Sequence, residues 1–245
     1  MRRLFLLLMM FPLTAVLGQG AELLKVADFE SGDLTQLRMQ KGAPDAITLV
    51  TEPVRAGKHA ARLLLRASDP EVSGGQRAEF SDRGTEILMD REYWYGLSLF
   101  VPEEFVTPKE RDAVLFQWHT QQGGPSPVLA IRVRGDEWVI TTDAVPNEKR
   151  KRLTYLPLEK GKWTDWVVNV KWAATPTGHL TIWKDGVQVV SEKDVVTQYP
   201  EKLGPYAKFG QYHSVDEAER NVIYADEYRV AGPGAGYEAV APGKK

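Results

Sequence analysis

The sequence contains no cysteine, so no disulfide bond can stabilise the folded chain. A chain without disulfides must depend on a hydrophobic core for its stability. The roughly 220 residues that follow the N-terminal segment are enough to form such a core.

The sequence also lacks an excess of charge of either sign, with 31 lysines and arginines against 33 aspartates and glutamates and a formal net charge of −2. A nucleic-acid-binding protein needs a basic face, so nucleic acid is not an expected partner. A local basic cleft for an anionic ligand remains compatible with this balance. The densest basic run is NEKRKR at 147–152, which we expect to be a solvated loop.

The first 20 residues follow the order of a secretory signal peptide: two arginines, a long apolar run, and small residues around Gly18 and Gly20. The apolar run is too short to favour a transmembrane helix, and an uncleaved anchor is the alternative. We therefore expect residues 1–20 to be removed. The mature protein is then secreted or periplasmic, by bacterial-type export, and has no membrane contact.

No linker, repeat or change of composition divides residues 21–234, which indicates one domain. Residues 235–245 are rich in glycine, proline and alanine, and we expect them to form a flexible tail. Most of the domain alternates between apolar and polar residues with the period of a β-strand, and no long segment has helical periodicity. Asp185 and Gly186 separate two alternating segments, which predicts a hairpin.

About a dozen alternating segments are too many for a small immunoglobulin-type sandwich. We therefore expect an all-β jelly-roll sandwich of two large antiparallel sheets, present as a monomer. Curvature of such sheets would create a concave groove that suits an extended polymer. The groove would be lined by side chains that point away from the core.

Strand alternation predicts which side chains reach this open face. In the segment 113–119, Phe116 and Trp118 are core residues, which turns Gln117 and His119 to the open face. The same rule assigns Leu115 to the open face.

A second alternating segment, YAKFGQYH, covers 206–213. Phe209 marks its core side, so Tyr206, Lys208 and Tyr212 are expected on the open face.

We also make predictions for four further residues in these alternating segments. Gly210 is expected to keep the groove floor open, and His213 points to the core side and is not a candidate for chemistry. Arg77 and Glu79 share one face of a third segment, and as an exposed charge pair they would contribute little to stability.

The sequence also lacks a recognisable pair of catalytic carboxylates. Glycoside hydrolysis generally needs two carboxylates at a fixed separation, and no strand carries the alternating acidic triplet expected for a hydrolase of this fold. Cleavage of a uronic-acid polymer by β-elimination needs other groups. A neutral or cationic group must hold the sugar carboxylate and stabilise the enolate, a base must take the C5 proton, and an acid must protonate O4.

Glutamine, arginine and lysine suit the first task, and histidine or tyrosine suits the other two. The pKa of a phenol, near ~10, makes tyrosine a poor base unless neighbouring cations such as Lys208 or Arg77 lower it.

Several motifs occur together in the order and approximate spacing of a known family: QRAEF, QWH, LEKGKWTDWVVNVKW, IWKDG, KFGQY and YADEYRV. Over nearly all of residues 25–231 the sequence resembles the polysaccharide lyases that are similar to heparin lyase I and glucuronan lyase. KFGQY is the most specific motif, whereas GKW before a tryptophan-rich strand is common in lectin-like sandwiches. The resemblance implies a concanavalin-like β-jelly roll and eliminative cleavage of a uronate polysaccharide.

The resemblance also implies roles for single residues. Lys208 and Tyr212 match the lysine and the catalytic tyrosine of the heparin lyase motif, His119 matches its histidine, and Arg77 matches its cleft arginine. Gln117 is our own candidate for the amide that neutralises the substrate carboxylate.

Gln76 is a substitute for Gln117 in that role, and Tyr206 and Arg132 are candidate substrate-binding residues. Heparin lyases carry a large basic insertion for sulfated substrate that this chain lacks. We therefore expect the anionic polysaccharide to be an unsulfated uronan, such as glucuronan or alginate. Whether the base is a histidine or a tyrosine depends on which epimer is cleaved, and this stays open.

Relatives often bind a calcium ion away from the cleft. Glu30, near the start, and Asp226, in the last strand, would be neighbours if the termini meet on one sheet. Together with backbone carbonyls they could hold a structural Ca²⁺. Two exposed carboxylates beside a turn are the alternative, and no organic cofactor is expected.

A non-catalytic carbohydrate-binding module is the main rival interpretation. Trp94, Trp138, Trp163 and Trp183 could stack on sugars, but their alternation also fits core packing. A binding module has no need for a histidine and tyrosine pair that can act as base and acid.

Overall fold

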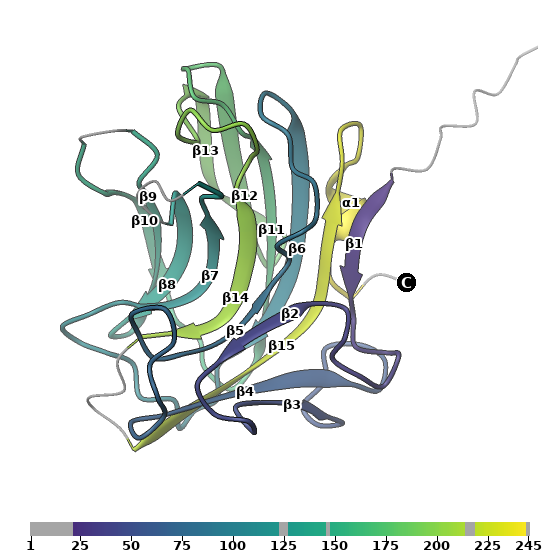
Figure 1. The fold of residues 1–245 in the computed structure, drawn as a ribbon, viewed down its shortest axis with the longest axis vertical. Helices are drawn as coiled ribbons and strands as arrows, with labels where there is room; N and C mark the ends of the chain where they lie inside the picture. The colour runs from purple at the N-terminus through teal and green to yellow at the C-terminus, as the bar shows by residue number, and fades with distance from the viewer. Residues whose placement is uncertain (1–21, 123–126, 146–147, 214–218, 244–245) are drawn as a thin grey trace, which may run out of the picture.

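The computed structural model describes residues 22–122, 127–145, 148–213 and 219–243 of the chain. The predicted signal peptide, residues 1–20, lies outside these ranges. Two antiparallel sheets pack face to face (Figure 1), so the predicted all-β sandwich is confirmed. No helix in the described residues has the length and apolar character needed to cross a membrane.

Sheet A contains eight strands. Their spatial order is β13 (Val187–Val195), β12 (Gly178–Lys184), β11 (Trp163–Lys171), β6 (Glu92–Phe100), β15 (Arg220–Ala231), β4 (Ala60–Arg66) and β3 (Ile47–Val50), with β1 (Leu23–Ala27) paired to β15. The first and last strands are therefore neighbours, as expected. The predicted hairpin joins β12 to β13, with positive φ angles at both Asp185 and Gly186.

Sheet B contains seven strands. Their spatial order is β10 (Lys151–Pro157), β9 (Glu137–Thr142), β8 (Leu129–Arg134), β7 (Ala113–His119), β14 (Tyr206–Tyr212), β5 (Arg77–Ser81) and β2 (Arg38–Lys41). The three segments in which we predicted polar open faces are thus β7, β14 and β5, which lie side by side in the middle of this sheet.

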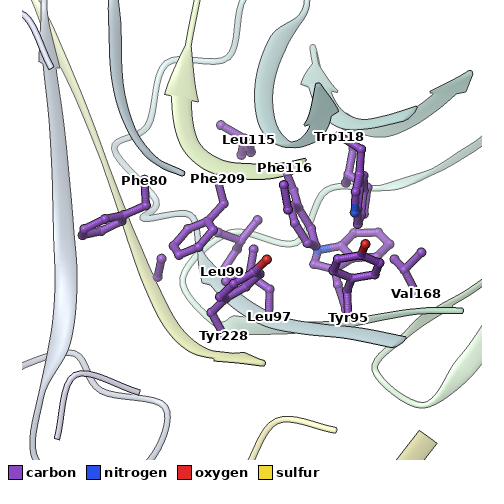
Figure 2. Packing of buried hydrophobic residues seen from close by; sticks show 14 of the residues in the cluster. Phe80, Tyr95, Leu97, Leu99, Leu115, Phe116, Trp118, Val168, Phe209 and Tyr228 are labelled. Carbon is purple, nitrogen blue, oxygen red and sulfur yellow. The ribbon is translucent and has the colours of Figure 1, made fainter. Parts of the chain in front are cut away.

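Aromatic side chains fill the space between the sheets (Figure 2). Phe116 and Trp118 of β7 lie 4.2 Å apart between ring centroids, and Trp118 meets Tyr95 of sheet A edge to face at 5.4 Å. Phe209 of β14 lies 4.8 Å from Tyr228 of β15. Burial of each such side chain stabilises the fold by roughly 1.5–3 kcal/mol, so β7 and β14 are fixed from their core sides.

A bulge alters the predicted alternation in β7. The pairing register shifts between Val114 and Phe116, and Leu115 joins the core next to Phe116. The assignment of Leu115 to the open face is therefore wrong, because a bulge places two consecutive residues on one side.

Gly210 belongs to a second irregularity, in β14, where the register shifts between Phe209 and Tyr212. Its φ is +137°, and a Cβ added there would lie 2.2 Å from the carbonyl oxygen of Ala78 and 2.7 Å from Leu63 in the core. Gly210 is thus required by close packing on the core side. The expectation that it keeps a groove floor open is wrong.

The C-terminal segment is also ordered in a way that we did not predict. Residues Tyr237–Val240 form the short helix α1, and Val240 is fully buried against Val167 and Ala231. The tail predicted to be flexible therefore covers part of sheet A, because its apolar side chains have a hydrophobic surface to bury.

The Asp82 side chain links β14 of sheet B to β15 of sheet A. Its Oδ1 accepts a hydrogen bond from the backbone N–H of Ala207 at 2.7 Å, and its Oδ2 accepts one from the Tyr228 hydroxyl at 2.6 Å. Burial raises the pKa of this carboxyl to about 6, although both hydrogen bonds act in the opposite direction.

Asp82 should therefore make stability depend on pH. Because its pKa is higher in the folded chain than in the unfolded chain, its contribution to stability is lost as the pH rises from about 4 to about 6, by about 3 kcal/mol in total. Asp82→Asn cannot ionise, so its free energy of unfolding should improve relative to wild type by that amount over this range. Denaturant unfolding at a series of pH values measures the difference.

Asp136→Asn, at an exposed turn, is the matched control for the loss of a carboxylate. A difference between Asp82→Asn and wild type that stays constant from pH 4 to pH 7 would contradict the assignment.

Candidate active site

The open faces of β5, β14 and β7 bring the predicted residues together. Tyr212 lies opposite Arg77, and Lys208 lies opposite Gln117. Tyr206 lies opposite His119. Cross-strand partners on one face have Cβ atoms about 5 Å apart, so these six side chains form one cluster.

The carboxylate of Glu79 connects the cluster. Its Oε2 accepts hydrogen bonds from Lys208 Nζ at 2.5 Å and from Arg77 Nη1 at 3.2 Å. Its Oε1 accepts a hydrogen bond from Gln117 Nε2 at 2.5 Å. Glu79 and Lys208 are each only 1% exposed, so this is a buried ion pair and not the exposed charge pair that we expected.

Lys208 is enclosed by this arrangement. Burial lowers the pKa of its ammonium group, and the neighbouring Glu79 carboxylate acts against this. Because Lys208 is buried and bonded to Glu79, it supports the cluster from below. Lys208, one of the two cations expected to act on Tyr212, is thus paired with Glu79.

Arg77, the other cation expected to act on Tyr212, lies against the Tyr212 ring. Its guanidinium carbon lies 4.0 Å from the centroid of the Tyr212 ring, and its Nη2 donates to the carbonyl oxygen of Ser73. A Cβ added at Gly75 would come within 2.5 Å of the same ring. Tyr212 is therefore held between Arg77 and the backbone at Gly75, while its side chain stays partly exposed.

His119 is also partly exposed and is held in one orientation. Its ring stacks on that of Tyr206 with centroids 5.2 Å apart, and its Nδ1 lies 2.9 Å from the carbonyl oxygen of Thr120. A carbonyl can only accept, so Nδ1 carries the hydrogen in neutral His119 and Nε2 carries the lone pair. Burial lowers the pKa of His119 below its usual value, which keeps the ring neutral at pH 7.

Arg132 extends the cationic surface from the neighbouring strand β8. Its Nε donates to Thr141 Oγ1 at 3.0 Å, and its Nη2 is buried without a hydrogen-bond partner among the described residues. Burial lowers the pKa of Arg132 to about 10, so it remains charged at pH 7. A buried guanidinium N–H that lacks an acceptor is costly and can be satisfied by an anionic ligand.

Gln76 does not join the cluster. Its Nε2 lies within hydrogen-bonding distance of three backbone carbonyls, those of Arg66, Ala67 and Asp69. The amide therefore holds the segment after β4, and this replaces the prediction that Gln76 substitutes for Gln117. His213 is buried beside Gln211 and Phe105, on the core side as expected.

The two predicted calcium ligands both bind the chain segment 55–59. Asp226 Oδ2 accepts from the backbone N–H groups of Arg55 and Ala56, and Glu30 Oε1 accepts from two N–H groups of the same segment. Burial raises the pKa of Asp226 to about 7. No group of three or more acidic or histidine side chains in the described ranges is arranged to hold a metal, so most ligands of a Ca²⁺ ion here would be backbone carbonyls and water.

The tryptophans considered as sugar platforms lie elsewhere. Trp138 is fully buried in the core. Trp94 and Trp183 stack on each other in sheet A, and Trp163 packs on Phe100 of the same sheet. None of these four rings lies on the open face of sheet B.

A sequence profile described as polysaccharide lyase matches residues 29–229. The chain belongs to this family. No curated protein has significant sequence similarity to it.

Solved structures of lyases share the fold. An endo-β-1,4-glucuronan lyase from the fungus Trichoderma reesei is 20% identical, with a TM-score of 0.71 over 85% of this chain and 94% of that one. A family 7 alginate lyase is 10% identical, with a TM-score of 0.62 over 82% and 93% of the two chains; it was crystallised with substrate as a variant in which a histidine and a tyrosine are replaced by asparagine and phenylalanine. A family 14 alginate lyase from Aplysia kurodai is 13% identical, with a TM-score of 0.59 over 85% and 97%.

The hydrogen bonds that the Glu79 carboxylate accepts predict that the stability of the fold depends strongly on the charge of this group. Glu79→Gln leaves the Lys208 ammonium group buried without a counter-charge, which should lower the free energy of unfolding by about 3–5 kcal/mol. Adding Lys208→Met removes the stranded charge and should recover most of the loss. Denaturant unfolding of both single variants and the double variant measures the coupling. A double variant no more stable than Glu79→Gln would show that the two charges are not coupled.

Proposed function

We propose that this polysaccharide lyase is exported as a monomer and cleaves an unsulfated polyuronate, glucuronan-like or alginate, by β-elimination. The observation that carries the proposal is the placement of His119 and Tyr212, both reachable, on one face with Gln117 and two arginines. Among the site groups described above, Arg77, Lys208 and Arg132 are cations and Glu79 is a carboxylate, so these groups together carry an excess of positive charge. Such an excess suits an anionic polymer.

Gln117 and the arginines are suited to hold the sugar carboxylate. An amide nitrogen has two hydrogens, and Glu79 accepts only one of those of Gln117. The second hydrogen and the unpaired Nη2 of Arg132 can bond the carboxylate. They would stabilise the negative charge that develops on it when the C5 proton leaves.

The elimination itself needs one proton removed and one delivered. The base takes the C5 proton, the electron pair of that bond forms the C4–C5 double bond, and the C4–O4 bond breaks as O4 receives a proton. Nε2 of His119 is suited to be the base and the Tyr212 hydroxyl to be the acid when the two groups act across the ring. When proton and leaving group lie on the same face, Tyr212 can serve as both.

The comparisons support this assignment. The substrate complex of the family 7 alginate lyase was obtained after replacement of a histidine and a tyrosine, the two residue types assigned here to proton transfer. The glucuronan lyase has the higher TM-score of the two. The lack of a basic insertion in this compact chain favours a substrate without sulfate.

Incubation of the mature protein with glucuronan, alginate, hyaluronan and heparin tests the proposal directly. We expect ultraviolet absorbance from an unsaturated product with glucuronan or alginate, and none with heparin. Binding without any unsaturated product would favour the carbohydrate-binding module instead.

Tyr212→Phe should lower kcat by about 10²-fold or more, because it removes the proton donor and leaves the ring packed against Arg77. Tyr224→Phe, on sheet A and packed on Phe100, is the matched control and should keep wild-type kcat. If Tyr212→Phe retained full activity, the assignment of the acid would be wrong. The kcat of His119→Ala distinguishes the two proton-transfer schemes. It should fall strongly if His119 is the base and Tyr212 the acid, and much less if Tyr212 serves as both.

We also propose that a structural Ca²⁺ binds beside Glu30 and Asp226, away from the chemistry. An ion that binds only the folded chain raises stability in proportion to the logarithm of its concentration, so CaCl₂ should raise the Tm relative to EDTA. Asp226→Asn should abolish the response to calcium. A wild-type Tm that is the same in CaCl₂ and EDTA would exclude the site.

A further inference from the structure

The pairing register defines a row of side chains that crosses sheet B from the active site to the edge strand β10. Successive cross-strand partners on the open face are Arg77, Tyr212, Val114, Arg132, Val139 and Tyr155. Partners of this kind lie next to one another on the same face of a sheet. The row therefore leads from the proposed acid to Tyr155 without leaving the open face.

A second row runs beside the first. Lys208, Gln117, Ala130, Thr141 and Arg152 are successive partners in it. Between the active site and β10 the two rows contain small or medium side chains and one cation, Arg132, which is bonded to Thr141. An extended anionic chain could lie along them.

Arg152 and Tyr155 end the two rows and contact each other. Arg152 Nη1 donates to the Tyr155 hydroxyl at 2.9 Å, and the guanidinium carbon lies 5.8 Å from the ring centroid. Tyr155 is 48% exposed, which is unusual for so large a ring. Only one of the five N–H groups of Arg152 is used in this bond.

Two other cations of the basic run 147–152 have carboxylate partners. Arg150 lies 3.9 Å from Asp143, and Lys151 lies 3.5 Å from Glu192. Arg152 has no carboxylate within ion-pair distance among the described residues. The run that we expected to be a solvated loop thus contributes one unpaired arginine to the open face of a strand.

We propose that Arg152 and Tyr155 form a distal binding site for a uronate residue of the substrate chain. Arg152 would bond the carboxylate, and the exposed ring of Tyr155 would contact the sugar. Strands are about 4.8 Å apart, so β10 lies roughly 19 Å from β14 across the sheet, a span of several sugar residues. The inference rests on the proposed function, because it assumes that the polymer bound at Tyr212 is a polyuronate.

The test measures KM and kcat of Arg152→Ala and Tyr155→Ala with two substrates, polymeric glucuronan and its trisaccharide. The trisaccharide is too short to reach from Tyr212 to β10. Loss of one charge-assisted contact should raise KM for the polymer about five- to tenfold with kcat changed less than about twofold. KM for the trisaccharide should change much less. Arg152→Lys and Tyr155→Phe should restore most of the polymer affinity, since they keep the charge and the ring.

Lys58→Ala, at an exposed position in the segment before β4 of sheet A, removes one positive charge away from sheet B and should behave as wild type. If KM for the polymer is unchanged in the Arg152→Ala/Tyr155→Ala double variant, the distal site is wrong while the lyase function stands. Alginate replaces glucuronan if the wild type cleaves only alginate. If the wild type cleaves neither, equilibrium binding of both polymers to wild type and double variant decides: weaker binding by the double variant supports the site, and equal binding or none overturns it.

Discussion

Two cations and an amide share the carboxylate of Glu79 beneath the open face of sheet B, in surroundings from which water is largely excluded. A charge buried in this way is tolerated only when its partners are present and well placed. Lys208, Arg77 and Gln117 come from three neighbouring strands, so the carboxylate fixes the relative positions of their side chains. The remaining groups of the candidate site depend on this arrangement, because Arg77 in turn holds the ring of Tyr212.

The core provides the rigid support on the other side of the same strands. Phe116 and Trp118 of β7, and Phe209 of β14, pack against aromatic residues of sheet A. Gln211 adds hydrogen bonds from β14 to the backbone carbonyls of Leu63 and Asn221 in sheet A. Residues that alternate with these core residues are therefore presented on a surface that can move little, which suits proton transfers that require fixed distances.

The separation of a buried ion pair from partly exposed polar groups accounts for the chemistry that the open face of sheet B can support. The buried ion pair holds the amide, while His119 and Tyr212 remain partly exposed at its margin. A hydrolase would need a pair of reachable carboxylates, whereas the carboxylate at the centre of this cluster is occupied by its own cations. The arrangement fits the β-elimination that we propose for this polysaccharide lyase, in which a sugar carboxylate is neutralised, one proton is removed and one is delivered.

Much of the fold was predictable from the sequence because strand alternation is a local property. The period of two placed Phe116, Trp118 and Phe209 in the core and Gln117 and Tyr212 on the opposite face without knowledge of their neighbours. It failed at Leu115 and Gly210, where bulges interrupt the period. Bulges depend on how adjacent strands pair, and the sequence of one strand does not contain that information.

The sequence by itself determined the all-β sandwich, the family and the residue types available for elimination. The tertiary structure decided how those residues are used. It made Glu79 the centre of the cluster, placed Arg77 against the Tyr212 ring and Lys208 on Glu79, and assigned Gln76 to a neighbouring loop. It also buried Val240 and Ala241 of the C-terminal segment, which had looked flexible. The physical reason is the same in each case: the burial and the partners of a polar or apolar group are set by segments distant in the chain, and those neighbours decide whether its charge is paired, its pKa is shifted or its surface is covered.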